Sequence, residues 1–384
     1  MAKILLSAMS ALSGGATLYV DKLVSLFPNS LEHTLTVVSA TPPTLLYQQA
    51  NIRWIRAPGW TRNPVTRVFI GYLYFRFWRR PNQDFDAFFY AASIQDFPRV
   101  RRAKLIVAFH NMIPFDPATR RLYPFGYQRL RHWLLRLALR KIFTSCDLLL
   151  FSSKYAQAVI DEVIPTRRGR STMIYNAAIE THDQLHPSLA AMLPPLFVLY
   201  LSPILRYKRH LELIQAWALA KETQPTIARL VFAGSYSADP SYTRRVRRAV
   251  GRLNLSKDVI FLGHVPHSQT SELMRRSLFN VYASSCENGA MTLLELLRAG
   301  SPLISSISEP MPEIGGACLD YFDPQDIGGL ANLITAYLAD NNRRHLSALV
   351  ARKRSERYDW EATAEQTWAA IFATCGSGQL STVE

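Results

Sequence analysis

The chain has 384 residues, of which 48% are apolar and 19% are charged. This composition excludes a disordered chain, and the length exceeds what one hydrophobic core usually serves, so we expect two globular domains. The longest apolar run, 68–75, is far shorter than the roughly 18 to 20 residues that a membrane-spanning helix needs.

The net charge of +15 is concentrated in the first half of the chain. Residues 1–180 carry 24 Lys and Arg against 10 Asp and Glu, a net +14, whereas residues 181–384 carry 20 against 19, a net +1. This asymmetry predicts that the first half binds something anionic, such as a membrane surface, a phosphorylated acceptor or a nucleic acid.

The cysteines indicate neither a zinc site nor a disulfide framework, because no Cys-x-x-Cys pair occurs. Their spacing fits a protein of the reducing cytosol. The four cysteines are Cys146, Cys286, Cys318 and Cys375.

Short β-branched or aromatic runs alternate with amphipathic stretches in the first half, which predicts a parallel sheet covered by helices on both faces. The first run could also be a weak signal peptide, but the Gly14-Gly15 turn that follows it favours a buried strand. Strands are predicted at 3–8, 35–39, 87–90, 105–109 and 148–152, and a helix at 127–143.

A second series of the same kind begins after the Pro-, His- and Asp-containing loop at 180–195. It predicts a second parallel sheet with helices between its strands. Strands are predicted at 197–201, 230–233, 259–262, 280–283 and 302–305, and helices at 211–221, 242–253 and 291–298.

Basic and acidic residues follow the predicted strands of the second half, where ligands bind in a doubly wound sheet. Arg206 and Lys208 suit a diphosphate there, although a solvated basic turn would look the same. Glu287 follows another strand and Glu295 lies in the next helix, whose N-terminal amides point toward any phosphate placed there. By spacing alone, two such glutamates are more often surface carboxylates.

The surroundings of these glutamates resemble a known enzyme family. Residues 287–295 resemble the Glu-x7-Glu motif of the retaining glycosyltransferases of family four. The resemblance runs through most of the second half and extends, more weakly, to His110. Its other segments are 174–176, 261–265, 297–304, 309–314 and 322–326.

The resemblance implies the GT-B fold, in which two Rossmann-like, doubly wound parallel-sheet domains face a central cleft. It implies an acceptor-binding domain at 1–180, a nucleotide-sugar domain at 181–356 and a C-terminal helix at 357–384 that returns to the first domain. The implied activity is retaining transfer of a hexose to a glycan or lipid-linked acceptor in cell-surface polysaccharide or lipopolysaccharide synthesis.

The resemblance also implies roles for single residues. Glu287 would hold hydroxyls of the donor sugar, and Glu295 those of the ribose. Lys208 with Arg206 would face the diphosphate, and His110 would lie at the reaction centre. The other implied donor-site residues are Gly15, Gly263, Val265, Met291 and Thr292.

Two departures from the family pattern limit what carries over. Pro203 occupies the position of the family's usual arginine, which leaves Arg206 as the candidate substitute. Gly289-Ala290 replaces an aromatic–glycine pair, so no sugar selectivity is implied.

We expect no metal and no cofactor. Asp84 and Asp86 form a literal Asp-x-Asp, but they precede an apolar strand in the first half, where a strand-entry turn is the better interpretation. His264 and His267 lack a third ligand at useful spacing. Rival interpretations are a nucleotide-sugar epimerase of the same fold, a transferase-like subunit without catalysis, and a basic nucleic-acid-binding protein, although no nucleic-acid module is recognisable.

The predicted helix at 127–143 suggests where an anionic partner binds. Leu130, Trp133, Leu134 and Leu137 form an apolar stripe at helical spacing, and arginines occupy another face, as in helices that lie in a lipid interface. The stripe could instead pack on the sheet, but the aromatic and basic stretch at 69–80 favours the interface. We therefore expect a cytoplasmic protein bound peripherally to the inner face of the cell membrane.

Overall fold

The computed structural model describes residues 1–9, 15–30, 32–42, 49–62, 66, 85–91, 102–179, 181, 183–317 and 319–376. The chain forms two compact units. The first unit contains residues 1–115, 130–176 and 359–384, and the second contains residues 116–129 and 177–358.

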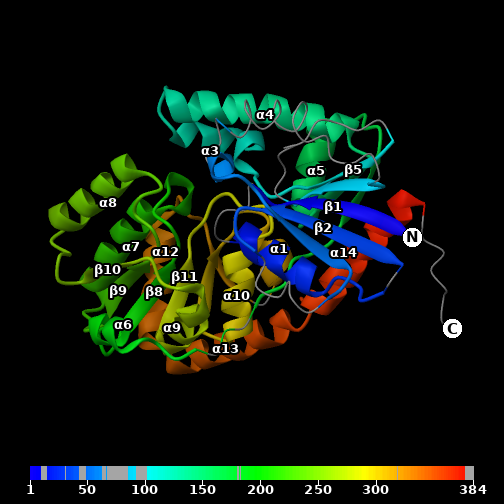
Figure 1. Ribbon diagram of the computed structural model, residues 1–384. Coiled ribbons are helices and arrows are strands. Elements are labelled where there is room, and N and C mark those ends of the chain that lie inside the picture. The colour runs from blue at the N-terminus through cyan, green and yellow to red at the C-terminus, as the bar shows by residue number, and fades with distance from the viewer. Residues whose placement is uncertain are drawn as a thin grey trace. The chain divides into compact units, whose positions relative to one another are not determined.

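The first unit is built on a wholly parallel sheet with the order β3-β2-β1-β4-β5-β6-β7 (Figure 1). Its central strands are apolar along almost their whole length because helices cover both faces of such a sheet. The strands are β1 (Ala2–Ser7), β2 (His33–Ser39), β3 (Ile52–Arg56), β4 (Ala87–Tyr90), β5 (Lys104–Ala108), β6 (Leu148–Phe151) and β7 (Arg170–Met173).

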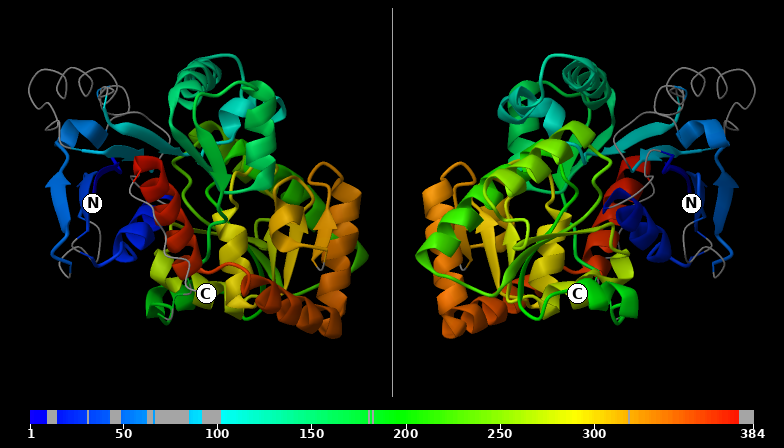
Figure 2. Two further views of the ribbon diagram at one scale, coloured as in Figure 1. Left: turned by 90° about the vertical axis from the view of Figure 1, so that its right-hand side faces the viewer. Right: turned by 90° about the vertical axis from the view of Figure 1, so that its left-hand side faces the viewer.

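The last helix of the chain packs within this first unit, beside α1 (Figure 2). The Trp368 indole N–H donates to the Leu23 carbonyl at 3.1 Å, and its ring meets Phe27 edge-on at 4.8 Å. The Thr363 hydroxyl donates to the Tyr175 carbonyl at 2.9 Å. The helices of this unit are α1 (Gly15–Ser25), η2 (Gly59–Arg62), η3 (Ile113–Phe115), α4 (Tyr127–Ser145), α5 (Lys154–Val163) and α14 (Trp360–Cys375), with the first residues of α4 grouped with the second unit.

The second unit is built on a six-stranded parallel sheet with the order β10-β9-β8-β11-β12-β13. One core layer lies between this sheet and helices α7, α8 and α12, and its largest side chains include Trp217, Tyr200 and Tyr337. The strands are β8 (Phe197–Leu201), β9 (Arg229–Ala233), β10 (Val259–Gly263), β11 (Phe279–Tyr282), β12 (Leu303–Ser306) and β13 (Asp320–Phe322).

Side-chain caps fix where the helices of the second unit begin. Asp239, Asp326 and Asp340 each accept a hydrogen bond from a first-turn amide of α8, α12 and α13, respectively. The helices are α3 (Pro117–Leu122), α6 (Pro187–Met192), η4 (Arg206–Lys208), α7 (His210–Thr223), α8 (Pro240–Arg252), η5 (His267–Gln269), α9 (Thr270–Arg276), α10 (Met291–Ala299), α11 (Met311–Gly315), α12 (Ile327–Ala339) and α13 (Asn341–Ser355).

The strands predicted from the sequence all occur, including β1 at the ambiguous start of the chain. The three strands that the sequence did not indicate, β3, β7 and β13, are all edge strands of their sheets. These three strands carry charged or hydroxyl residues, which an edge position tolerates, so their sequences lack a continuous apolar run. The edge strand β10 keeps such a run and was predicted.

Candidate functional site

A lysine and a glutamate from separate loops meet at the carboxyl ends of β8 and β11. Lys208 ends η4, which follows β8, and Glu287 lies in the loop between β11 and α10. The Lys208 Nζ donates to the Glu287 Oε1, and both side chains are largely buried. The sequence placed both residues in the donor site, and the structure brings them into direct contact.

Aromatic side chains surround this ion pair. The Lys208 Nζ lies 5.2 Å from the ring centroid of Tyr207 and 5.5 Å from that of Tyr282. Burial, followed by the nearby negative charge of Glu287, raises the pKa of both tyrosines well above the ordinary value. The Tyr200 hydroxyl donates to the Lys208 carbonyl at 2.6 Å. These contacts hold the Lys208 ammonium in a low-dielectric pocket, where its interaction with an anion is strong.

The second predicted glutamate lies on α10 and is held by a histidine. The Glu295 side chain is only 9% exposed, and its Oε1 lies 2.9 Å from the His267 Nε2. The hydrogen bond to Glu295 raises the pKa of His267 above the ordinary value, against the opposing effect of partial burial. Sequence reasoning considered His267 only as a metal ligand and did not find this contact, because the two residues are 28 positions apart.

The N-terminus of α10 lies beside these groups. Met291 and Thr292 are its first two residues, preceded by Ala290 in a left-handed conformation with φ 38°. The amides of the first turn of a helix have no partner within the helix and point outward along its axis. They give this edge of the sheet a positive potential that suits a phosphate.

The Arg206 guanidinium forms hydrogen bonds with other residues of the second unit. Its guanidinium donates to Asp239 at 2.8 Å, to Ser241 at 2.9 Å and to the Leu122 carbonyl at 3.4 Å. It also lies over the Tyr123 ring, 5.8 Å from the centroid. Backbone and side-chain hydrogen bonds and the Arg206 charge lower the pKa of Asp239, although burial opposes them. Arg206 therefore fastens the α3 segment and the start of α8 to η4.

The same contacts explain why residues 116–129 group with the second unit, although the sequence assigned them to the first domain. Besides the bond from Arg206 to Leu122, the Cys286 thiol contacts the Asp116 and Thr119 side chains. Because Cys286 directly precedes Glu287, this segment forms part of the surroundings of the Lys208–Glu287 pair.

The loop after β10 contributes the other predicted residues of the second unit. Gly263 has φ +81°, and a Cβ at this position would lie 2.6 Å from the Tyr236 hydroxyl, so any other residue would strain the backbone and displace the Tyr236 side chain. Val265 is buried. Both residues precede His267, which contacts Glu295 on α10.

The first unit holds the remaining two predicted residues, Gly15 and His110. Gly15 begins α1. His110 follows β5, and its ring meets Tyr19 edge-on at 4.7 Å. Burial lowers the pKa of His110 to about 4, although a hydrogen bond with the backbone of Ala91 opposes this. The imidazole is therefore neutral near pH 7 and can donate a hydrogen bond without carrying a charge.

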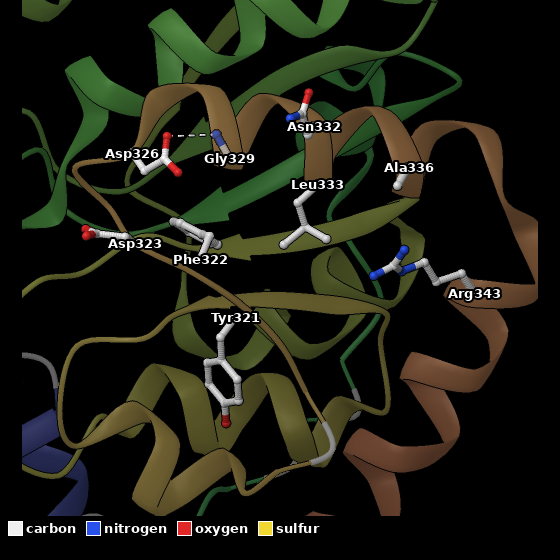
Figure 3. Close-up of a pocket in the computed structure, with 9 residues that line it drawn as sticks. All are labelled: Tyr321, Phe322, Asp323, Asp326, Gly329, Asn332, Leu333, Ala336 and Arg343. Atoms are coloured by element: carbon white, nitrogen blue, oxygen red, sulfur yellow. Dashed lines mark hydrogen bonds between the residues drawn. The ribbon is translucent and has the colours of Figure 1, made fainter.

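A surface pocket of about 430 Å³ lies elsewhere in the second unit, beside edge strand β13 (Figure 3). Asp323 and Asp326 lie at one end and Arg343 at the other, with Phe322 and Leu333 between them. The predicted donor residues do not line it, and Arg343 forms an ion pair with Asp320.

Of the two discounted acidic residues, Asp86 accepts a hydrogen bond from the backbone amide of Lys3 at 2.8 Å, directly before β4. Asp84 lies outside the described residues, as do Gly14 and the aromatic and basic stretch at 69–80. Within the described part of the chain, no group of three or more His, Cys, Asp or Glu side chains is placed to hold a metal ion. In that same part, no helix combines the length and hydropathy needed to cross a bilayer.

Two parallel-sheet α/β units are the architecture of the GT-B fold. The sequence model of "Glycosyl transferases group 1" matches residues 182–354, and that of "Glycosyltransferase Family 4" matches residues 13–179. The chain belongs to this family-four-like group of glycosyltransferases.

Solved structures of low sequence identity share the fold. Sucrose-phosphate synthase from Thermosynechococcus elongatus superposes with a TM-score of 0.71 at 17% identity, over 98% of this chain and 100% of that one. Anabaena Alr3699/HepE in complex with UDP and glucose superposes with a TM-score of 0.68 at 17% identity, over 97% and 100% of the two chains.

Among curated proteins, similarity is confined to shorter segments. The O-antigen chain mannosyltransferase B of Escherichia coli is 26% identical over 107 residues, which is 28% of each chain. The glycogen synthase of Mycobacterium tuberculosis is 30% identical over 122 residues, 31% of this chain and 29% of the relative. The matched part thus spans less than a third of these relatives.

Proposed function

We propose that this protein is a retaining, metal-independent glycosyltransferase. It moves a hexose from a nucleotide-diphosphate sugar to a glycan or lipid-linked acceptor in the synthesis of a cell-surface polysaccharide or lipopolysaccharide. The complex of Anabaena HepE with UDP and glucose and the similarity to an O-antigen mannosyltransferase support this donor and acceptor class.

The observation that carries the proposal is the buried contact between Lys208 and Glu287. A buried charge that loses its partner is strongly destabilised, so a ligand that separates the pair must supply a new partner to each. A nucleotide sugar does so, because its diphosphate accepts from Lys208 and its sugar hydroxyls donate to Glu287. A nucleoside diphosphate offers only the first of these.

Transfer breaks the bond between the sugar C1 and the diphosphate oxygen and forms one between C1 and the acceptor oxygen. The acceptor proton passes to the departing phosphate oxygen, on the same face of the sugar, so the configuration is retained without a covalent enzyme adduct. Lys208 and the first amides of α10, at Met291 and Thr292, stabilise the charge that develops on the leaving group. The neutral His110 donates a hydrogen bond to the sugar.

The first test is a thermal-shift panel with the UDP, GDP, TDP and CMP sugars, followed by turnover of the best binder. Nucleotide sugars should stabilise the protein more than the corresponding nucleoside diphosphates. Activity should survive EDTA, and NMR of the initial product should show the donor's anomeric configuration. An inverted product, or a modified donor sugar formed without any acceptor, contradicts the proposal.

Helix α4 supports the second half of the proposal, a membrane-bound acceptor. Its apolar stripe is exposed to solvent: Leu130 is 55% exposed, Trp133 49%, Leu134 52% and Leu137 44%. Arg140 and Lys141 next to this stripe are also exposed, and residues 117–146 contain no acidic residue. An exposed apolar face with tryptophan and flanking cations is complementary to an anionic bilayer surface.

We propose that this face docks on anionic lipid head groups and so brings the enzyme to a lipid-linked acceptor. Phosphatidylglycerol vesicles should sediment the protein at low salt and release it at high salt. The substitutions Leu134→Glu with Leu137→Glu, or Arg140→Glu with Lys141→Glu, should abolish sedimentation and leave nucleotide binding unchanged. The matched control replaces two exposed leucines of α13, Leu346→Glu with Leu349→Glu, and should sediment like wild type. If wild-type protein ignores the vesicles, the acceptor is soluble.

A further inference from the structure

The contact between His267 and Glu295 joins two separate parts of the candidate donor site. His267 begins η5, after the loop that follows β10, and Glu295 lies on α10, one turn beyond the helix N-terminus. The His267 Nε2 and the Glu295 Oε1 are 2.9 Å apart. The His267 backbone is itself fixed, because its carbonyl accepts from the Thr270 hydroxyl at 2.8 Å.

Glu295 needs such a partner because its carboxylate is buried, with the side chain only 9% exposed. Leu293, Leu294, Leu296 and Leu297 of the same helix are each 2% exposed or less. A carboxylate in this environment is costly unless a donor satisfies it. A carboxylate has two oxygens and about four acceptor positions, so the bond from His267 to Oε1 leaves most of this capacity for further donors.

We infer that His267 is a positioning residue, which fixes the Glu295 carboxylate so that its remaining acceptor positions bind the ribose hydroxyls of the donor. The inference rests on the proposed function, which places the ribose at Glu295. His267 thereby acts on the donor through Glu295, and not as a metal ligand.

The charge on His267 also bears on donor binding. Ionisable residues on the adjoining elements are His264 on the same loop, which is exposed, and Glu272 on α9, which forms ion pairs with Arg275 and Arg276. A third is His186, whose backbone amide donates to Gln269 of η5 at 2.9 Å. Glu295 is thus the carboxylate that faces the imidazole. Protonated His267 offsets the Glu295 charge and favours the anionic donor, so affinity should fall as the pH rises and His267 becomes neutral.

The test compares His267→Ala with His267→Gln, whose amide can donate as the imidazole does, and uses His264→Ala as the matched control. Binding is measured with UDP or GDP, whichever raises the melting temperature more, and with the 2′,3′-dideoxy form of the same nucleotide. Loss of the His267 hydrogen bond should weaken ribonucleotide binding about three- to tenfold, the range expected for one hydrogen bond to a charged group near the surface.

The dideoxy ligand isolates the ribose. Wild-type protein should prefer the ribonucleotide, His267→Ala should lose most of that preference, and His267→Gln should restore it. With a nucleotide sugar, His267→Ala should raise KM and change kcat by less than about twofold. Wild-type affinity should weaken from pH 6 to pH 8.5, while that of His267→Gln should not.

Two failures are distinguishable. If wild-type protein binds none of the nucleotides at any pH, the proposed function itself is wrong. If wild-type protein binds but His267→Ala retains the full preference for the ribonucleotide, or His267→Gln behaves like His267→Ala, the positioning role is wrong and the proposed function is unaffected.

Discussion

The two units use their charged residues in opposite ways. In the second unit, cations and carboxylates from distant positions pair in partly or largely buried contacts, such as Lys208 with Glu287 and Arg206 with Asp239. In the first unit, the cations of α4 are numerous, and residues 130–146 offer them no acidic neighbour in sequence. The charged residues thus form defined ion pairs in the second unit and a basic surface on α4 in the first.

Net charge alone therefore does not locate a binding site. The second half of the chain is almost neutral, with 20 basic and 19 acidic residues, yet it contains most of the candidate donor residues. A site for a diphosphate and for hydroxyl groups needs both signs at defined positions, whereas a lipid surface needs only a sufficient density of one sign.

The largest expected effect comes from separating the pair in the second unit. Lys208→Ala removes the cation from the diphosphate and leaves Glu287 buried without its ion-pair partner, so initial rates should fall about 10²- to 10³-fold and the melting temperature should drop. Lys221→Ala is the matched control, because Lys221 pairs with Asp258 at a more exposed position of the same unit. Equal losses in the two variants would mean that the Lys208 pair only supports the fold.

The two glutamates should separate into different kinetic effects. Glu287→Ala should lower kcat by about 100-fold, since the sugar hydroxyls are held closest to the reacting carbon. Glu295→Ala should mainly weaken donor binding, by about tenfold, because it loses the hydrogen bonds to the ribose. Steady-state kinetics with the best donor measures kcat and KM for both variants. If Glu287→Ala mainly weakened donor binding and Glu295→Ala mainly lowered kcat, Glu287 would hold the ribose and Glu295 the sugar.

Arg206 should affect stability more than donor binding, because its guanidinium is already occupied by Asp239, Ser241 and Leu122. Arg206→Gln should lower the free energy of unfolding by about 2 kcal/mol, since it leaves a buried carboxylate without its cation. Arg245→Gln, an exposed change on α8, is the control. Denaturant titration measures the change in stability, and nucleotide titration measures the change in affinity. A large loss of affinity with unchanged stability would mean that Arg206 binds the diphosphate after all.

The smallest expected effect is the pH-dependent contribution of His267 to stability. The pKa of His267 is raised by Glu295, so its contribution to stability is complete below the ordinary value near 6.5 and is lost as the pH rises through the folded value. Because His267 is a third exposed, this contribution should be about 0.5 kcal/mol or less.

The pKa of His110 is lowered to about 4, so its contribution has the opposite sign: it is complete above pH 6.5 and is lost as the pH falls toward 4. Urea titrations of His267→Gln and His110→Gln at pH 5 and pH 8 should therefore show opposite trends. Parallel trends would mean that the two histidines share one kind of environment.

The two sheets and the order of their central strands along the chain follow from local sequence patterns. Each central strand is a short apolar run between polar turns, and that pattern is local, so it can be read without the fold. Lys208, Glu287 and Glu295 could be singled out for a related reason, since each stands just beyond a strand or on the helix that follows.

Which charged side chains meet depends on the tertiary fold. The Lys208–Glu287 and His267–Glu295 contacts join residues 79 and 28 positions apart, and nothing in a local pattern records such a distance. Strands β3, β7 and β13 escaped detection because their short sequences carry charged or hydroxyl residues, so only pairing with a neighbouring strand identifies them. The exposure of the α4 stripe depended on whether anything packed against it. Long-range packing settles all of these, because burial and pairing are properties of neighbours in space.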